Sequence, residues 1–431
     1  MGGLASFAPF LRSMQGQWEI FRCFHRFFLK SVQVFRSCSV HKRMTYPSFV
    51  RALAVSSVFA GSLLTVGAKE LAGGEIKVNA DASVDNAYGL SGTNGGDSLH
   101  GALVAGVAWD QKPVESRPVS FNAFASVLWV EGHGPSDQFL SDDMAASNSE
   151  AYESLRLYEW WGQATVGAWS VRLGALLADV EFCGTTPGGS LINSGFGWPA
   201  FISASTLNTG PAYYAAALGT RLAFTGETTT WKIGVYDGDS FDDPDGSDHP
   251  NRHGTHYEIN NDQGAFIISE LNWAPTNSAF RYQVGAWMHT ADFADTDGTD
   301  TIHSGNYGSY AAIERTLAGK TGEKGNIEAH VRAGFAPEDR NAFGWTLDTG
   351  VAAIGLLPGR DADTLAVGFV HADRATNVDG LDFEQVYELS YTIVLNDHLS
   401  LQPDLQYIRH PASDSTRDNA LMFLLRLSAS Y

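Results

Sequence analysis

The chain has 431 residues, of which 28 are Lys or Arg and 48 are Asp or Glu, which gives a formal net charge of −20. This acidic balance argues against a nucleic-acid partner, because few basic residues remain to neutralise phosphates. The 45 Gly, 25 Phe, 15 Tyr and 11 Trp residues favour strands and turns over a helical bundle.

The first 68 residues differ in charge from the rest of the chain. They hold eight basic residues and one acid, whereas residues 69–431 hold 20 basic and 47 acidic residues, a net charge of −27. The apolar stretch 52–66 follows basic residues and ends in the small residues Gly67 and Ala68, which is typical of a secretory signal peptide. It is shorter than the roughly twenty residues that a membrane-spanning helix needs. A buried core helix is the alternative.

We therefore expect an N-terminal extension without a structural role at 1–43, a signal peptide at 44–68 and a mature domain at 69–431. Either Met1 or Met44 is the initiator under this interpretation. Cleavage after Ala68 leaves Cys183 as the only cysteine of the mature chain, so no internal disulfide is expected.

From residue 75 onward, polar and apolar residues alternate in short segments, the pattern of a strand with one apolar face. In the first segment, Ile76 and Val78 are apolar while Lys77 and Asn79 are polar. The alternation predicts sixteen strands, near 75–89, 99–110, 119–131, 155–166, 169–179, 216–226, 229–238, 264–274, 279–290, 307–318, 326–336, 343–356, 363–374, 385–396, 399–409 and 419–431.

An even number of strands of this length predicts an all-β fold, a transmembrane antiparallel up-and-down β-barrel. Short connections such as 396–398 alternate with long ones such as 183–215, as periplasmic turns alternate with outer loops. A soluble β-sandwich or β-solenoid is the alternative. Aromatic residues at strand ends favour the barrel, since they suit a membrane interface: Trp109, Trp129, Trp160, Trp161, Trp273 and Tyr407. Pro403 lies inside a predicted strand, where its missing N–H predicts a bulge.

Several segments together resemble the carbohydrate-selective porins of Gram-negative outer membranes. They occur in the family's order: WSVRLGALLADVEF (169–182), NSGFGWP (193–199), ALGTRLAF with WKIGVYDGD (217–239), GLLPGRDADTLAVGF (355–369), LSLQPDLQYI (399–408) and ALMFLLRL (420–427). The resemblance covers most of 155–431.

The resemblance implies an outer-membrane porin through which small sugars such as glucose diffuse passively into the periplasm. It also implies contact with outer-membrane lipid, lipopolysaccharide and the barrel assembly machinery, and a homotrimer, because porins usually form one. The alternative function is that of a secreted or surface-exposed β protein that binds glycans without transporting them.

The two-residue alternation also predicts which polar side chains face the lumen. If Trp169 and Val171 face lipid, and the corresponding residues do so on other strands, eight charged residues line the pore: Arg172, Arg221, Lys232, Arg281, Glu328, Arg332, Asp404 and Arg426. Such a lining exchanges hydrogen bonds with sugar hydroxyls at little net cost. Alternatively, these residues only pair with one another. Leu425 is expected to face lipid, and Arg426→Leu is expected to be tolerated.

The long connection 183–215 is uncharged and rich in Gly, Pro and aromatic residues. Folded into the lumen, it would narrow the pore and present Phe196 and Trp198, with Tyr213 and Tyr214, for stacking on sugar rings. An external Ω-loop is the alternative.

The aspartate-rich stretch 237–248 and the histidines that follow it, His249, His253 and His256, are candidates for a metal site. The stretch lacks the ligand spacing of an EF-hand, so a solvated acidic loop without metal is the favoured interpretation. The sequence contains no G-x-S-x-G or H-E-x-x-H motif. We therefore expect neither catalysis nor a cofactor.

Overall fold

The computed structural model describes residues 70–431 apart from 72, 94, 115–116, 244–249, 376–377 and 379. The predicted N-terminal extension and signal peptide thus lie outside the described residues. The chain divides into two compact units, Met1–Glu75 and Ile76–Tyr431. Strand β2 begins in the first unit and continues into the second.

Strands make up most of the second unit, and among its described residues only short helical turns occur in the connections. The two-residue strand β1 (Glu70–Leu71) lies in the first unit. The other strands are β2 (Gly74–Ser91), β3 (Asp97–Gln111), β4 (Val119–His133), β5 (Ser154–Val166), β6 (Trp169–Leu176), β7 (Ala217–Thr225), β8 (Thr229–Asp237), β9 (Ala265–Trp273), β10 (Phe280–Ala294), β11 (Ile302–Ala318), β12 (Ile327–Phe335), β13 (Phe343–Ile354), β14 (Thr364–Arg374), β15 (Phe383–Asn396), β16 (Leu399–Arg409) and β17 (Ala420–Ser430). The helical turns are η1 (Ser136–Leu140), η2 (Gly188–Ser190), η3 (Ser194–Phe196), α3 (Ala200–Ser203), η4 (Leu207–Thr209) and η5 (Pro411–Ser413). Within the described residues, no helix is long and apolar enough to cross a membrane.

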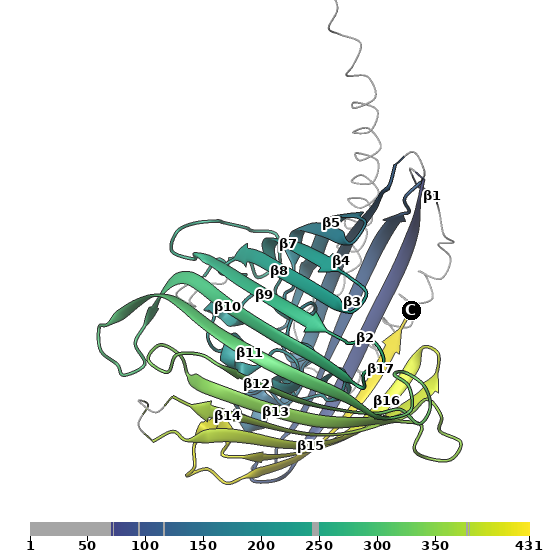
Figure 1. The fold of residues 1–431 in the computed structure, drawn as a ribbon. Coiled ribbons are helices and arrows are strands. Elements are labelled where there is room, and N and C mark those ends of the chain that lie inside the picture. The colour runs from purple at the N-terminus through teal and green to yellow at the C-terminus, as the bar shows by residue number, and fades with distance from the viewer. Residues whose placement is uncertain are drawn as a thin grey trace, which may run out of the picture. The chain divides into compact units, whose positions relative to one another are not determined.

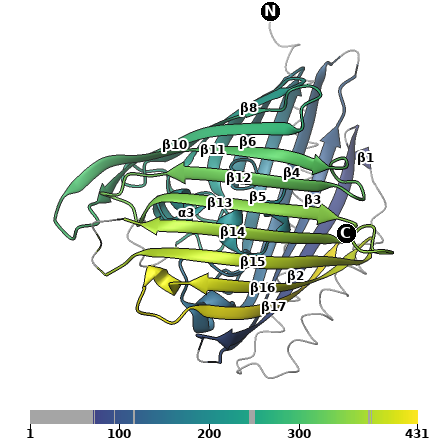
Figure 2. The same cartoon turned by 60° about the horizontal axis from the view of Figure 1, so that its bottom comes forward.

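Strands β2 to β17 form one closed sheet. Each is a neighbour of the next in the sheet, and β17 pairs antiparallel with β2 (Figures 1 and 2). In the described part of the chain, these sixteen strands leave no free edge, which is how a barrel satisfies its backbone hydrogen bonds in lipid. All sixteen strands predicted from the alternation are confirmed. The fifth ends at Leu176 rather than at 179, because the chain turns into the lumen there.

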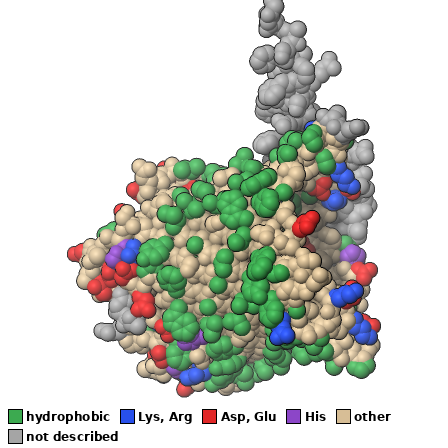
Figure 3. Space-filling view, viewed as in Figure 1, with side chains coloured by type: hydrophobic (Ala, Val, Ile, Leu, Met, Phe, Trp, Pro, Cys, Tyr) green, Lys and Arg blue, Asp and Glu red, His purple; other side chains and the backbone are tan. Residues whose placement is uncertain are grey.

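The outer face of the barrel is apolar and the inner face is polar. On β6, Trp169, Val171 and Leu173 are 42–58% exposed although they are apolar. On β12, the inward residues Glu328, His330 and Arg332 are polar and buried. The inward Met422 and Leu424 of β17 are exceptions, because they pack in an apolar cluster with the loops. Hydrophobic side chains are spread over the strands in Figure 3. An apolar outer surface of this extent is stable in contact with lipid and not in contact with water.

Long and short connections lie at opposite ends of the barrel. The longest, 134–153, 177–216 and 238–264, all lie at one end, whereas the tight turns 167–168 and 397–398 lie at the other. This arrangement confirms that long and short connections alternate between the two ends. In outer-membrane barrels the long loops belong to the outer side and the short turns to the periplasmic side.

Pro403 is accommodated without the expected bulge. Pairs on either side of it, Ser390 with Asp404 and Ile393 with Leu401, keep one register along the β15–β16 ladder. The ladder is only interrupted locally, because proline removes one donor and shifts no neighbour. The prediction of a bulge at this position was therefore wrong.

The largest hydrophobic cluster lies between the inner wall and the loops, rather than between two sheets. Leu140, Ile192 and Phe196 from two loops pack with wall residues that include Val370 and Val386. Loop burial therefore stabilises the structure and fills part of the lumen at the same time.

Candidate functional site in the barrel lumen

Loop 177–216 is fixed inside the barrel by Arg332 of β12, which is fully buried. The Nε of Arg332 lies 2.7 Å from Oδ2 of Asp348 on β13. Its Nη atoms donate to four loop carbonyl oxygens, those of Cys183 (2.6 Å), Gly195 (3.1 Å), Phe196 (3.0 Å) and Gly197 (3.0 Å). A rigid guanidinium fork that meets several carbonyl groups holds the loop in one position.

Carboxylates of the wall accept hydrogen bonds from backbone N–H groups of the same loop. Ile192 and Asn193 donate to Glu388 of β15 at 2.5 and 3.0 Å. Cys183 donates to Glu270 of β9 at 2.7 Å. Each bond satisfies a loop N–H that would otherwise be buried without a partner. Loop 177–216 therefore narrows the lumen and is not an external Ω-loop.

A second loop, 134–153, also folds into the lumen, although no pattern in its sequence led us to predict this. Asp143 and Met144 donate their N–H groups to Glu384 of β15 at 2.8 and 2.9 Å. The segment 141–150 contains small polar residues but lacks the Gly, Pro and aromatic residues that marked the other loop. The dense run of Ser, Asn and Asp residues is the only feature of this segment that could have indicated a loop inside the lumen.

Arg426 of β17 links this second loop to the wall. It forms a two-bond ion pair with the fully buried Asp85 of β2, with Nε at 2.8 Å and Nη2 at 2.7 Å from the carboxylate oxygens. It also donates to Asn148 (2.8 Å), Ser147 (3.0 Å) and Ser149 (3.2 Å). Ion pairs in which an arginine donates two hydrogen bonds to one carboxylate are stronger than hydrogen bonds between neutral groups.

The other predicted lumen cations are paired as well. Arg172 and Arg221 share Glu181, at 2.8 and 2.6 Å. Lys232 lies 3.5 Å from Glu270 and donates to the Glu181 carbonyl. The structure thus brings Arg172, Arg221 and Lys232 together under loop 177–216.

Arg281 forms a separate cluster with Glu314 (2.8 Å) and Glu328 (2.9 Å). Asp404 is buried and accepts a hydrogen bond from Gln406 at 3.0 Å. Because Glu328, Arg332 and Asp404 are each at most 1% exposed, these three do not line an open pore. For Glu328 and Arg332, which pair with Arg281 and Asp348, the alternative of pairing within the protein describes the structure. Asp404 forms no ion pair with any described residue, but its burial corrects the prediction that it lines the pore.

The two predicted aromatic residues lie in different environments. Phe196 is 1% exposed and packs in the cluster between loop and wall, so its ring has no free face for a sugar. Trp198 is half-buried, donates from Nε1 to the Thr209 carbonyl at 2.9 Å and borders the open part of the lumen. The stacking role expected of Phe196 is therefore corrected, whereas that of Trp198 fits its position.

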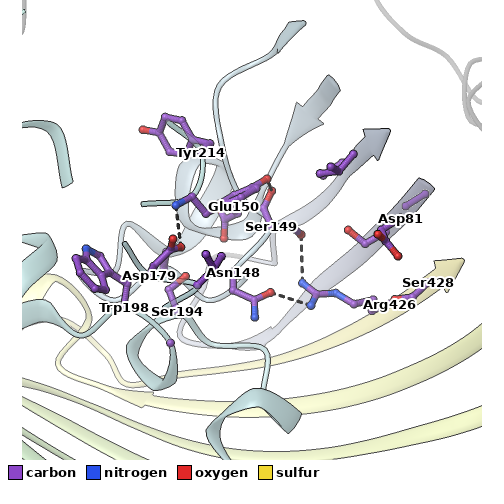
Figure 4. Close-up of a pocket in the computed structure, with 18 of the residues that line it drawn as sticks. Asp81, Asn148, Ser149, Glu150, Asp179, Ser194, Trp198, Tyr214, Arg426 and Ser428 are labelled. Atoms are coloured by element: carbon purple, nitrogen blue, oxygen red, sulfur yellow. Dashed lines mark hydrogen bonds between the residues drawn. The ribbon is translucent and has the colours of Figure 1, made fainter. Parts of the chain in front are cut away.

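The open part of the lumen is a cavity of about 870 Å³ between the two loops and the wall formed by β2, β3, β15, β16 and β17. Figure 4 shows Arg426 reaching from the wall towards Asn148 and Ser149, with Asp179, Trp198 and Tyr214 also at the cavity. Hydroxyl, amide and carboxylate groups thus face the same space as two aromatic rings. This combination can bind polyhydroxylated solutes through hydrogen bonds and ring stacking.

In the described part of the acidic stretch 237–248, an aspartate side chain accepts hydrogen bonds from backbone N–H groups of the same stretch. Asp239 accepts from the N–H groups of Phe241 (2.9 Å) and Asp243 (2.8 Å). His253 bonds the Leu155 carbonyl at 2.9 Å, and His249 lies outside the described residues. No group of three potential metal ligands occurs among the described residues.

One cluster resembles a catalytic triad in composition but not in geometry. His100 Nε2 lies 3.0 Å from Ser149 Oγ and 3.4 Å from Asp85 Oδ2, while its buried Nδ1 has no hydrogen-bond partner. In a triad, serine and aspartate contact opposite nitrogens of the ring. Here both contact the same one, and Arg426 neutralises the aspartate.

Burial raises the pKa of several carboxyl groups in the loops, including Glu150 and Asp179. The pKa of Glu150 rises to about 8, through burial first and the charge of Asp142 second. The pKa of Asp179 rises to about 6, through burial, although the Tyr213 N–H donates to it at 2.8 Å. Glu150 holds loop 134–153 together, because it accepts from Ser136 and Ser147.

We predict that alkaline pH loosens loop 134–153. The pKa of Glu150 is higher in the folded loop than in the unfolded chain, so the protonated carboxyl group stabilises the loop. This stabilisation is complete below the ordinary pKa near 4.5 and is lost as the pH rises through about 8. Single-channel conductance in planar bilayers should therefore rise between pH 7 and pH 9. Glu150→Gln, which stays neutral, should remove the step; a step of the same size in this variant would contradict the assignment.

Comparison with known proteins agrees with this architecture. Residues 125–431 match the model of the family described as carbohydrate-selective porin, OprB family. The high-pH structure of Pseudomonas putida OprB is similar with a TM-score of 0.72 and 15% identity, over 83% of this chain and 94% of that chain. A multiple mutant of the Rh. blastica porin is similar with a TM-score of 0.51 and 10% identity, over 83% of this chain and all of that chain.

No curated protein sequence matches the chain. At these identities the two structural similarities show the fold alone. The family model, in contrast, matches well over half of the sequence, including thirteen of the sixteen barrel strands in full, β5 to β17. The chain therefore belongs to the OprB family of carbohydrate-selective porins.

Proposed function

We propose that small sugars cross the bacterial outer membrane through this barrel by passing between loops 134–153 and 177–216. The observation that carries the proposal is the cavity of about 870 Å³ that remains where both loops are fixed to the wall. Its volume suits a small solute rather than a folded chain. Passage is passive diffusion, and membership of a family of porins supports this part of the proposal.

A sugar in this cavity exchanges its hydration for protein hydrogen bonds. Asn148, Ser149 and Arg426 supply donors and acceptors from one side, while Trp198 and Tyr214 offer ring faces. Each exchange is nearly neutral in free energy, because a bond to water is replaced by a bond to protein. The solute therefore binds weakly enough to leave again, as conduction requires.

Liposome swelling tests transport directly. Glucose should enter proteoliposomes faster than a disaccharide, and the rate should scale with the protein content. The second candidate function, glycan binding without transport, predicts no swelling with any sugar.

Trp198→Ala is predicted to lower the preference for glucose over a linear polyol of similar size by roughly threefold to tenfold, equivalent to about 0.7–1.4 kcal/mol of lost stacking. The ratio of swelling rates measures this preference. Trp345→Ala, on the outer face of β13, is the matched control and should leave the ratio unchanged. An unaltered ratio in Trp198→Ala would remove Trp198 from the pathway.

We further propose that residues 44–68 direct export and are removed after Ala68, leaving the barrel domain 69–431. The charge difference between the two parts of the sequence supports this division. Lipopolysaccharide, the barrel assembly machinery and further copies in a homotrimer are proposed partners. The exposed apolar residues on the outer face of the barrel support contact with lipid. The closed sheet of the barrel supports assembly into the outer membrane by the barrel assembly machinery.

A further inference from the structure

The charges that line the cavity do not balance. Five carboxyl groups border it, those of Asp81, Asp143, Glu150, Asp179 and Asp397, against a single arginine, Arg426. Because burial raises the pKa of Glu150 to about 8, this group is mostly neutral at pH 7.5, and the other four carry the negative charge. Arg426 contributes little free charge, because Asp85 lies within 2.7 Å of it. On the acidic side only Asp143 has an ion-pair partner, Arg374 at 3.5 Å. The one histidine at the cavity, His398, stacks on Tyr431.

Asp81, Asp179 and Asp397 form no ion pair with any described residue, and they come from three separate elements. Asp81 lies on β2, Asp179 in loop 177–216 and Asp397 in the β15–β16 turn. Oδ2 of Asp179 accepts from the Tyr213 N–H, whereas Oδ1 is buried without a hydrogen-bond partner. Figure 4 shows Asp81 and Asp179 on different sides of Arg426.

The remaining lumen cations do not offset these carboxylates. Arg172 and Arg221 both meet Glu181, and Arg281 meets two glutamates. Arg332 is fully buried against Asp348. Arg172 and Arg221 share the single carboxylate of Glu181, but neither of them borders the cavity. Among the described residues that line the cavity, the charges left unpaired are therefore negative. In a narrow, low-dielectric passage, fixed charges of one sign raise the concentration of counter-ions and exclude co-ions.

We infer that the channel excludes anions and admits neutral and cationic solutes, so that among sugars it accepts hexoses and amino sugars and rejects sugar acids and sugar phosphates. The inference concerns the charge of the permeant, and for sugars it rests on the proposed function. It reverses the expectation from the sequence alone, in which inward-facing arginines line the pathway.

The reversal potential under a KCl gradient across a planar bilayer tests the ion selectivity. The unmodified protein at pH 7.5 should favour K⁺ over Cl⁻ at least fivefold. In the variant Asp81→Asn/Asp179→Asn/Asp397→Asn, the ratio should fall to below twofold, while heat-modifiable migration on a denaturing gel confirms that the barrel still forms. Asp300→Asn, an exposed residue in the connection 295–301 that is not part of the cavity lining, removes a carboxylate as a control and should keep the fivefold preference. Equal permeability or a preference for Cl⁻ in the unmodified protein, or an unchanged ratio in the triple variant, overturns the inference.

Swelling rates with glucose, glucosamine and glucuronate extend the test to sugars. Glucosamine should enter at least as fast as glucose, and glucuronate at least fivefold more slowly, with the triple variant narrowing the gap. Glucuronate entering as fast as glucose would overturn the inference while leaving the proposed sugar passage intact. Conversely, a K⁺-selective channel that no sugar crosses would refute the proposed function and leave the ion selectivity standing.

Discussion

Replacing Arg332 with methionine is expected to release loop 177–216 from the barrel wall and to raise single-channel conductance severalfold. The substitution removes the donors of four loop carbonyl groups and the partner of Asp348, which keeps only His330 at 2.7 Å. Breaking a buried ion pair by removing one partner costs about 3–5 kcal/mol. Because Arg332 is the main anchor of loop 177–216, a loss of this size should detach the loop from the wall.

The measurement is conductance in planar bilayers, together with the preference for glucose over larger sugars in swelling assays. Arg315→Met on neighbouring β11 is the matched control, because Arg315 faces outward and lies over the Phe280 ring. It should leave both quantities unchanged. Arg332→Met channels that fold and conduct like the unmodified protein would show that the loop is held by Glu388 and Glu270 instead.

Arg426→Leu is expected to destabilise the barrel by about 3–5 kcal/mol. Inspection of the sequence suggested that this change would be tolerated, but the structure pairs Arg426 with the fully buried carboxylate of Asp85. Removing the arginine leaves that charge buried, with Ser147, Ser149 and His100 as its remaining partners.

The double variant Asp85→Leu/Arg426→Leu gives this prediction a sharp control. Replacing a buried ion pair by apolar residues is often neutral, so the double variant should recover most of the stability lost in the single one. Urea unfolding followed by tryptophan fluorescence measures both. If the two variants were equally destabilised, the loss would come from the hydrogen bonds to loop 134–153 rather than from the unpaired carboxylate.

The sequence by itself determined the barrel and the orientation of its side chains. Successive residues of a strand point to opposite faces, so an apolar Trp169 and Val171 place Arg172 inward whatever the rest of the chain does. Closure of sixteen strands follows from the same local pattern, because lipid tolerates no free edge. These properties depend on neighbours in sequence, and the structure confirms them for the described residues.

Only the tertiary structure decided what the inward side chains meet. Arg426 and Asp85 are 341 positions apart, and the Ile192 N–H and Glu388 are 196 apart, distances over which no local pattern carries information. Whether an inward arginine faces water or a loop carbonyl depends on how the long loops fold back. How the loops fold depends on burial of loop side chains such as Ile192 in one apolar cluster with wall residues such as Val386, which come from distant parts of the sequence. For this reason the strands could be predicted from the sequence, whereas the lining of the pore could not.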